Sequence, residues 1–440
     1  MKKTYISLII SLGITYSPLI MAQELPDPKP MSIEEVFELA LANSTQMKVA
    51  AKYTELAHQQ TEINKLYLLP SISADLDYGY ISNADIWTPS FSGHQKGAIP
   101  HQFTQFSIMA GKIIFKGGAI SNTIQKSTLE EQVAVLNLER NTSDIKFLMA
   151  AKYLDIYRLI NQAKVFENNI KLARNRLDNI LTMQKQGMLT KNDVLRTELT
   201  ISDLLLNLRK IKNNISIYNH QLNMVTGLPA ATQLVPDTSL LKRHTHQESL
   251  SFFLAEAYRE NHELKIAGMD NRIAQTEIKL LGSDRYPEVV FFTGTNLKRP
   301  FLNTIPSIDI FYNVWQAGIG IKYNISSIYQ SPKKIKAGRI RLELSIQNQA
   351  LQLQNLEVSV SSFYIKYNEA KDELATYQND LRSALENYRI VEKKYFAQLA
   401  LLTDMLDASN TKIEAELKVT SALVNVQYTW YQLLKSIGTI

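Results

Sequence analysis

The chain has 440 residues and no cysteine, with only 16 glycines and 13 prolines, which are unevenly placed. Residues 119–186 and 339–437 contain neither glycine nor proline. Compact α/β folds need turn residues far more often, so these stretches predict long helices. The lack of cysteine excludes disulfides and thiolate metal sites. The net charge of +6 comes from interspersed charges, which do not favour a nucleic-acid partner.

Residues 1–22 have the layout of a secretory signal peptide. Lys2 and Lys3 precede an apolar run over residues 5–14, and the most plausible cleavage site follows Ala22. The apolar run falls short of the ~20 residues that a spanning helix needs, which disfavours the alternative of a membrane anchor. We therefore expect an exported protein.

The first structural element is predicted to be a helix that follows Ser32 and ends near Pro70. Ser32 and Glu35 have the spacing of a capping box. Residues 71–80 then alternate between apolar side chains at even positions and small or polar ones at odd positions. That period of two predicts a strand with one apolar face. A second, weaker strand is expected over about 102–115.

Residues 119–226 predict a helical hairpin with its tip near 187–193, where Gly187 breaks the helix. Apolar residues recur along the long helices at alternating spacings of three and four, which is the seam of a coiled coil. At ~1.5 Å per residue, a helix of this length would span about 100 Å. That is a suitable length for crossing a periplasm.

The second half of the chain repeats the first. Residues 47–50 match residues 264–267 at an offset of 217, and residues 193–195 match residues 404–406 at an offset of 211. The offset stays constant within each of the two matching blocks, which indicates a duplication. The duplicated unit consists of a helix, two strands and a long helical hairpin. The predicted division of the chain is a first repeat over 23–227, a connector over 228–245, and a second repeat over 246–440. The second repeat is expected to hold strands at about 288–297 and 314–325, and a hairpin over about 333–437 with its tip near 398–404.

The predicted strands have the length that a transmembrane β-strand needs, which is about 9–11 residues. Four strands cannot close a barrel, since membrane barrels begin at about eight. An open sheet edge cannot lie in lipid. If these strands cross a membrane, several chains must therefore share one barrel. The alternative is a small soluble sheet.

Several short segments, in this order and duplicated, resemble the TolC-type outer-membrane efflux protein family. They are residues 40–44 leading to 69–73, residues 114–118, residues 186–195, and Tyr395 followed by residues 404–408. The resemblance covers about 32–438. It implies a mainly α-helical fold in which a small part of the chain forms strands of a membrane β-barrel. Three chains would form a homotrimer with a twelve-stranded barrel in the outer-membrane lipid and a coiled-coil tunnel in the periplasm.

The function implied by this resemblance is a passive exit duct for small molecules in a tripartite efflux pump. The implied partners are a periplasmic adaptor and, through it, an inner-membrane pump of RND, ABC or MFS type. The chain has no phosphate-binding loop, and we expect no enzyme activity, cofactor or metal site. The alternatives are a type I protein secretion duct, a trimeric adhesin and a periplasmic coiled-coil spacer. Adhesins place their strands contiguously at the C-terminus, whereas the strands here are split two and two.

The resemblance places adaptor docking at the two hairpin tips. The expected docking residues are Gly187, Met188, Leu189 and Thr190 in the first tip, and Leu401, Leu402 and Thr403 in the second. Two positions depart from the family pattern. Gln398 replaces the glycine usual at the second tip, and Ala400 stands where some members carry a basic residue of the closed gate.

The resemblance also places a gate just past the tips. Asp193, Asp404 and Asp407 stand where the family has pore-facing carboxylates, and three copies of each would form a ring that favours cations. The other interpretation is that these aspartates stabilise helix N-termini, and the two roles are compatible. Tyr395 keeps an aromatic gate position of the family, although its spacing in the seam favours a packing role.

Overall fold

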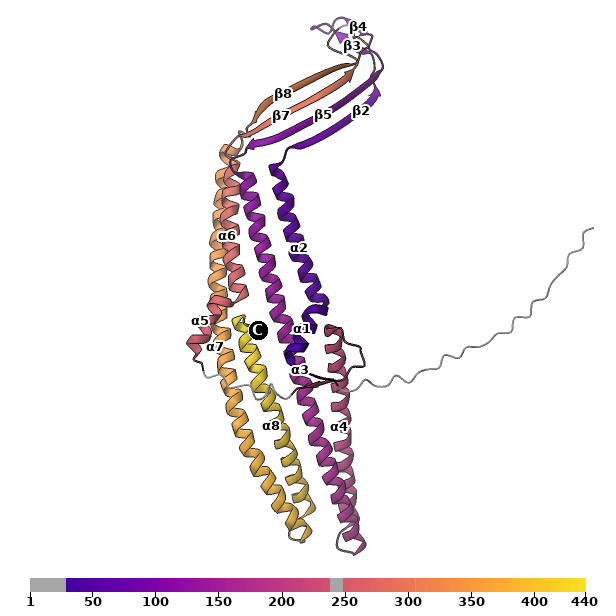
Figure 1. Ribbon diagram of the computed structural model, residues 1–440, viewed down its shortest axis with the longest axis vertical. Coiled ribbons are helices and arrows are strands. Elements are labelled where there is room, and N and C mark those ends of the chain that lie inside the picture. The colour runs from indigo at the N-terminus through magenta and orange to yellow at the C-terminus, as the bar shows by residue number, and fades with distance from the viewer. Residues whose placement is uncertain (1–28, 238–247, 305) are drawn as a thin grey trace, which may run out of the picture.

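The computed structural model describes residues 29–237, 248–304 and 306–440. The predicted signal peptide with Ala22, the end of the connector and the start of the second repeat lie outside the described residues. The molecule is elongated, with a four-stranded sheet at one end and the tips of two helical hairpins at the other (Figure 1). Among the described residues, no helix is both long and apolar enough to cross a membrane.

The first half of the chain holds one set of elements. They are β1 (Lys29–Met31), α1 (Ile33–Asn43), α2 (Thr45–Lys65), η1 (Leu66–Leu68), β2 (Ser71–Tyr80), β3 (Ala84–Trp87), β4 (His94–Gly97), β5 (Gln102–Phe115), α3 (Ala119–Lys185) and α4 (Lys191–Thr226). β6 (Leu234–Pro236) follows in the predicted connector. The second half holds α5 (Leu250–Glu260), α6 (His262–Ser283), β7 (Glu288–Arg299), β8 (Tyr312–Lys322), α7 (Ser327–Phe396) and α8 (Leu402–Ile437). The predicted fold class, mainly helical with a small sheet share, is confirmed.

The main sheet has the order β2-β5-β7-β8, with every neighbouring pair antiparallel. Leu76 pairs with Phe106, and Phe106 pairs with Leu297. Directly paired residues share a face, so the alternation seen in β2 continues across all four strands. One face carries mostly apolar side chains, among them Ile72, Leu76, Ile108, Phe291, Trp315 and Ile319; the other carries many polar ones, among them Asp75, Asp77, Gln105, Ser107, Asn296 and Gln316.

The predicted single helix between Ser32 and Pro70 is wrong, because the chain leaves the helical conformation at Ser44. Ser44 has φ −57° and ψ 126°, and Asn261 in the second repeat has φ −61° and ψ 122°. These two breaks are separated by the same 217 residues as the sequence repeat. Each break receives the C-terminal end of a long helix.

Hydrogen bonds join each long helix to the break above it. Asn43 Nδ2 donates to the Thr226 carbonyl at 2.8 Å, and Asn261 Nδ2 donates to the Ser436 carbonyl at 3.0 Å. The end of α4 thus meets the start of α2, and the end of α8 meets the start of α6. Free carbonyls at a helix end need such partners.

Three other boundaries differ from the sequence prediction. α7 begins at Ser327, before the expected 333, and includes Pro332 in its second turn. A proline at this position removes the ladder hydrogen bond to the Ile328 carbonyl, and its ring crowds that carbonyl. β7 extends to Arg299, and β8 covers Tyr312–Lys322 where 314–325 was expected. The connector contains β6, which pairs in parallel with β1.

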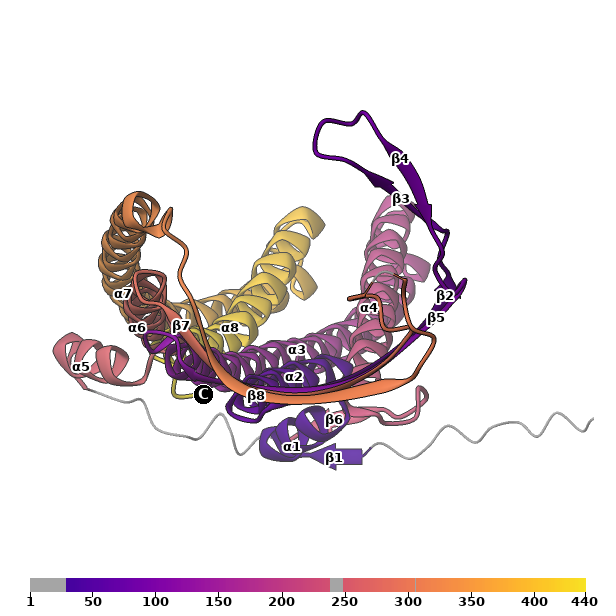
Figure 2. The same ribbon diagram turned by 90° about the horizontal axis from the view of Figure 1, so that it is seen from above.

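The core is a series of small clusters along the helices. Predicted seam residues of α3, including Phe166 and Ile170, pack against Ile201 and Leu204 of α4. Near the middle of the molecule, the buried Tyr153 hydroxyl donates to the Met31 carbonyl at 2.8 Å and accepts from the Asp237 amide at 2.8 Å. Helices α1 and α5 lie on the convex side of the arc that the long helices form (Figure 2).

Replacing Gly227 with alanine should destabilise the junction of α4 and α1. Gly227 has φ +75°, and a Cβ there would lie 2.9 Å from Asn43 Cγ. A left-handed backbone costs an L-residue about 1–2 kcal/mol, and the clash adds to that. Gly187→Ala is the matched control, since Gly187 has φ +76° but nothing within 4 Å of the added Cβ. The apparent melting temperature should fall more for Gly227→Ala, and equal losses would contradict the proposed close approach.

Candidate functional site at the hairpin tips

The two tips have the same backbone geometry despite different sequences. α3 ends at Lys185 and α7 at Phe396, 211 residues apart, as in the sequence repeat. Gly187 has φ +76° and its equivalent, Gln398, has φ +60°. The missing glycine at the second tip therefore leaves the turn unchanged, at a cost of about 1–2 kcal/mol for a side chain in the left-handed region.

Asp193 and Asp404 stabilise the starts of α4 and α8. The Asp193 carboxylate accepts from the Thr190 amide at 2.8 Å and from the Thr190 hydroxyl at 2.7 Å. The Asp404 carboxylate accepts from the Leu401 amide at 3.0 Å. Leu401 has no side-chain acceptor, so the second tip has only this half of the capping box. In the described part of the chain, Asp407 is exposed and makes no hydrogen bond or ion pair.

The predicted docking residues differ in accessibility. Met188 is 55% exposed and Leu401 is 70% exposed, and Thr190 and Thr403 are also exposed. Leu189 is half-buried, and Leu402 is only 6% exposed because it packs against the tip core. Leu399, which the sequence did not single out, is 77% exposed. The accessible apolar surface of the second tip is therefore formed by Leu399 and Leu401.

Tyr395 is buried in the small core that holds the two tips together. It packs in one cluster with Ile180 of α3, Val194 of α4 and Met405 of α8. Burial, with a further contribution from the nearby Asp193 charge, raises the pKa of Tyr395 to about 12. Its hydroxyl is buried without a hydrogen-bond partner among the described residues. The packing role predicted from its seam spacing agrees with this position.

A buried polar network connects the two hairpins a few turns above the tips. Arg176 of α3 is only 4% exposed. Its Nη2 donates to the Tyr388 hydroxyl of α7 at 3.0 Å and to Ser409 Oγ of α8 at 3.3 Å. The Tyr388 hydroxyl in turn donates to Glu392 Oε1 at 2.7 Å. Burial and this bond to Glu392 raise the pKa of Tyr388.

A second buried cation extends the network. Lys412 of α8 is 6% exposed, and its Nζ lies 5.0 Å from the Tyr388 ring centroid. It donates to Asn169 Oδ1 at 3.3 Å and lies 3.6 Å from Glu416. Asn169 Nδ2 also donates to Glu416 at 2.8 Å. Buried cations without such partners would be costly, so these contacts fix the relative positions of α3, α7 and α8.

Sequence reasoning missed this network. Arg176 and Arg174 are both arginines in the same stretch of α3, but Arg174 is exposed. A single sequence carries no signal that separates the two, because the deciding contacts come from helices more than 200 residues away. The described residues hold no group of three or more histidine or acidic side chains that could bind a metal.

Replacing Asp404 with alanine should destabilise the start of α8, whereas replacing Asp407 should not. Asp404→Ala removes the acceptor for the Leu401 amide, which typically costs about 1 kcal/mol. Asp407→Ala removes the same charge one turn later, where no capping contact exists. Thermal unfolding of the two variants gives the comparison. Equal effects would mean that the charge, not the cap, determines stability.

Comparison with known proteins agrees with this geometry. Residues 253–439 match the model of the outer membrane efflux protein family. The matched residues cover nearly all of the second repeat, so this part of the chain is similar to that family. The resemblance to TolC-type efflux proteins, expected from the duplicated motifs, is thereby confirmed. A sequence search finds no curated relative that matches the chain significantly.

Solved structures of outer-membrane channels share the fold over nearly the whole chain. The outer membrane protein VceC from Vibrio cholerae has a TM-score of 0.76 at 11% identity, covering 92% of this chain and 96% of VceC. The Campylobacter jejuni CmeC outer membrane channel has a TM-score of 0.73 at 13% identity, with 92% and 85% covered. The open-state Neisseria gonorrhoeae MtrE outer membrane channel has a TM-score of 0.67 at 14% identity, with 92% and 88% covered. Both repeats therefore have the fold of these channels.

Proposed function

We propose that this protein is the outer-membrane channel of a tripartite efflux pump, a passive trimeric exit duct for small molecules. One observation carries the proposal. A four-stranded sheet has an exposed apolar face, and neither of its edge strands, β2 and β8, pairs with another strand among the described residues. The match to the efflux protein family favours this duct over a type I secretion duct.

The sheet has the chemistry of a membrane segment that one chain cannot complete. Leu76 is 69% exposed and Ile319 is 66% exposed, so apolar side chains on the same face have no cover within the chain. Lipid supplies that cover. In lipid, every backbone polar group must be paired, so the free edges of β2 and β8 must meet other chains. Three copies give a closed twelve-stranded barrel.

The helices then form the periplasmic part of the duct. α3 has 67 residues and α7 has 70, so each spans about 100 Å. The protein lies in the outer membrane with these helices in the periplasm. The exposed tip residues Met188, Leu399 and Leu401 form the surface for a periplasmic adaptor, which connects the duct to an inner-membrane pump. The channel is not an enzyme, and transport energy comes from the pump.

The gate lies between the tips and the buried network. Asp404 and Asp407 are exposed near the start of α8, and three copies would form a ring of carboxylates that favours cations. Asp193 is held by Thr190 and contributes to the same end. Ala400 stands where some family members carry a basic gate residue. Arg176 takes over that role in this chain, because it links α3 to α7 and α8.

The barrel is tested by placing a charge on each face of β2. Leu76→Arg puts a charge on the lipid face near the midplane and should cost about 2–4 kcal/mol. Asp77→Asn, on the other face, should leave assembly intact. The measurement is the yield of heat-resistant trimer in the membrane fraction, with its mass in detergent three times that of the mature chain. A monomeric mass for the folded wild-type protein would rule out the shared barrel.

The network is tested by Arg176→Met. The variant loses the hydrogen bonds to Tyr388 and Ser409 and leaves those buried hydroxyls with one partner fewer, which should cost about 1–3 kcal/mol. Single-channel conductance in planar bilayers should rise because the hairpins can separate. Arg174→Met, which removes an exposed charge from the same helix, is the control. Wild-type conductance in both variants, with trimers intact, would argue against a role for Arg176 in closing the duct.

A further inference from the structure

The start of α7, just below the sheet, carries an excess of positive charge (Figure 1). Residues 327–343 contain five lysines and arginines and one acid, Glu343. The same length of α3, which also begins at the sheet, contains one lysine and two glutamates over residues 119–135. The excess is therefore a property of α7 and not of every helix that begins at the sheet.

Most of these cations have no acidic partner. Lys334 is held by Asp284 at 2.8 Å, and Lys126 of α3 is held by Glu277 at 2.6 Å. Four cations of α7 are exposed and, among the described residues, lie beyond ion-pair distance of any acid: Lys333, Lys336, Arg339 and Arg341.

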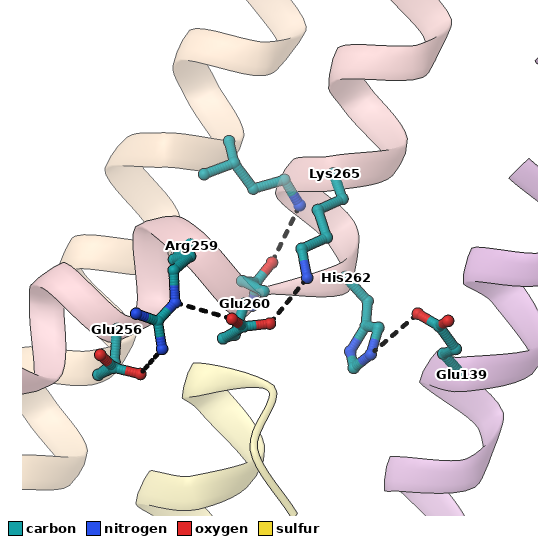
Figure 3. A network of polar contacts seen from close by, with 8 residues as sticks. Glu139, Glu256, Arg259, Glu260, His262 and Lys265 are labelled. Atoms are coloured by element: carbon teal, nitrogen blue, oxygen red, sulfur yellow. Dashed lines mark hydrogen bonds and ion pairs between the residues drawn. The ribbon is translucent and has the colours of Figure 1, made fainter. Parts of the chain in front are cut away.

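Cations of α5 and α6, by contrast, are neutralised. Figure 3 shows Arg259 held by Glu256 and Glu260, at 2.7 and 2.8 Å. Lys265 lies 2.9 Å from Glu260 in the same network. These charges are not available to an anionic partner, whereas those at the start of α7 are.

Arg339 points to the convex side of the arc. Glu357 of α7 accepts a hydrogen bond from Tyr258 of α5 at 2.6 Å, and α5 lies on the convex side (Figure 2). Arg339 precedes Glu357 by 18 residues, which are five turns of an α-helix, so the two side chains point the same way. Lys336 lies about 60° to one side of that direction. When copies of the arc close in the proposed trimer, the convex side is the outer one.

The apolar face of the sheet continues to the start of α7. Ile321 of β8 is exposed on that face, and the alternation continues past the end of the strand through the exposed Tyr323 and Ile325. Ile328, in the first turn of α7, is also exposed. It precedes Arg339 by eleven residues, about three turns, so it points to the same side. The unpaired cations therefore follow directly where this apolar surface ends.

The side chains of α7 lean towards the sheet. Every Cα–Cβ bond in an α-helix tilts towards the N-terminus, and the N-terminus of α7 is at the sheet (Figure 1). Lys336 and Arg339 lie about 12 Å and about 16 Å below Ile328 along the helix, and their long stems carry the charges several ångström back. The headgroup layer on each side of the hydrocarbon is about 5–8 Å thick. The two charges therefore reach the outer part of the headgroup layer that adjoins the apolar surface.

Lys112 and Tyr286 extend this surface along the base of the sheet. Lys112 lies near the end of β5, opposite Phe291 on the apolar face, and is exposed without an ion pair in the part of the chain that the structure describes. A lysine there can bury its stem in hydrocarbon and extend its ammonium group to the interface. Tyr286 is exposed in the turn before β7, and its ring packs edge-on against Phe115 with centroids 6.1 Å apart. Tyrosine is enriched at this level of membrane proteins.

We propose that the base of the sheet binds anionic phospholipids in the periplasmic leaflet of the outer membrane. The lipid phosphates lie against Lys112, Lys336 and Arg339, and the acyl chains lie against the apolar face above them. Glu343, the one acid at the start of α7, lies one turn farther from the sheet than Arg339 and does not offset the cations. The inference rests on the proposed function, because it needs the sheet to lie in a membrane.

The probes are phosphatidylglycerol and phosphatidylcholine, each titrated into the purified trimer in detergent micelles. Native mass spectrometry counts the lipids that each trimer retains. Phosphatidylglycerol should half-saturate the trimer at the lower mole fraction, and added salt should weaken its binding. Lys336→Gln with Arg339→Gln should raise the half-saturating fraction of phosphatidylglycerol roughly fivefold for each cation removed. Retention of phosphatidylcholine should stay at the wild-type level, which shows that the variant is folded.

The matched control is Arg209→Gln with Lys210→Gln on α4. It removes one arginine and one lysine that are also exposed and, among the described residues, unpaired, but that lie in the half of the molecule away from the sheet (Figure 1). The control should retain wild-type affinity for phosphatidylglycerol. Equal loss in both variants, or equal half-saturation by the two lipids, would overturn the proposal.

Planar-bilayer conductance of the wild-type protein separates this inference from the proposed function. A trimer that conducts but does not prefer phosphatidylglycerol would overturn the lipid site and leave the duct standing. A protein that does not insert into bilayers would overturn both.

Discussion

The proposed assembly depends on one constraint, which is that a sheet with two free edges cannot exist in lipid on its own. The pairing of β5 with β7 joins the two repeats at the centre of the sheet and leaves β2 and β8 at its edges. The chain therefore supplies an arc and not a closed wall. The curvature of the helices follows the same arc (Figure 2). In the proposed trimer, a duct arises when copies of the arc close on one another.

The duplication explains how one repeated unit of helices and strands builds such a long molecule. In each repeat a long helix (α3 or α7) runs to a tip, and a second helix (α4 or α8) returns to the middle of the molecule. There it ends at a break between two shorter helices, α1 and α2 or α5 and α6. The breaks at Ser44 and Asn261 make the same contact from different positions, since the asparagine amide that receives the helix end lies one residue before the first break, at Asn43, and at the second break itself, at Asn261. At the tips, Gly187 and Gln398 likewise occupy the same left-handed conformation. Backbone geometry is preserved where side chains have diverged.

Charge placement separates the parts of the proposed duct. Above the tips, Arg176 and Lys412 are buried and bound by side chains of other helices, so they hold the hairpins together. At the sheet, the polar residues Asp75 and Asp77 share one face opposite the apolar one. Charged residues thus serve cohesion above the tips and solvation at the sheet, according to what surrounds them.

The sequence by itself determined the repeat, the long helices and the two-faced strands, because periodicity and the placement of glycine and proline are local properties. The strand at Ser71–Tyr80 and the capping box at Ser32 have the bounds that their local pattern predicts. Only the tertiary structure decided that Ser44 interrupts a helix, that β6 pairs with β1, and that Leu402 is buried while Leu399 is exposed. It also decided which arginine is buried, since Arg176 and Arg174 differ only in what packs against them. These outcomes depend on contacts between residues far apart in the chain, and no local pattern in one sequence encodes them.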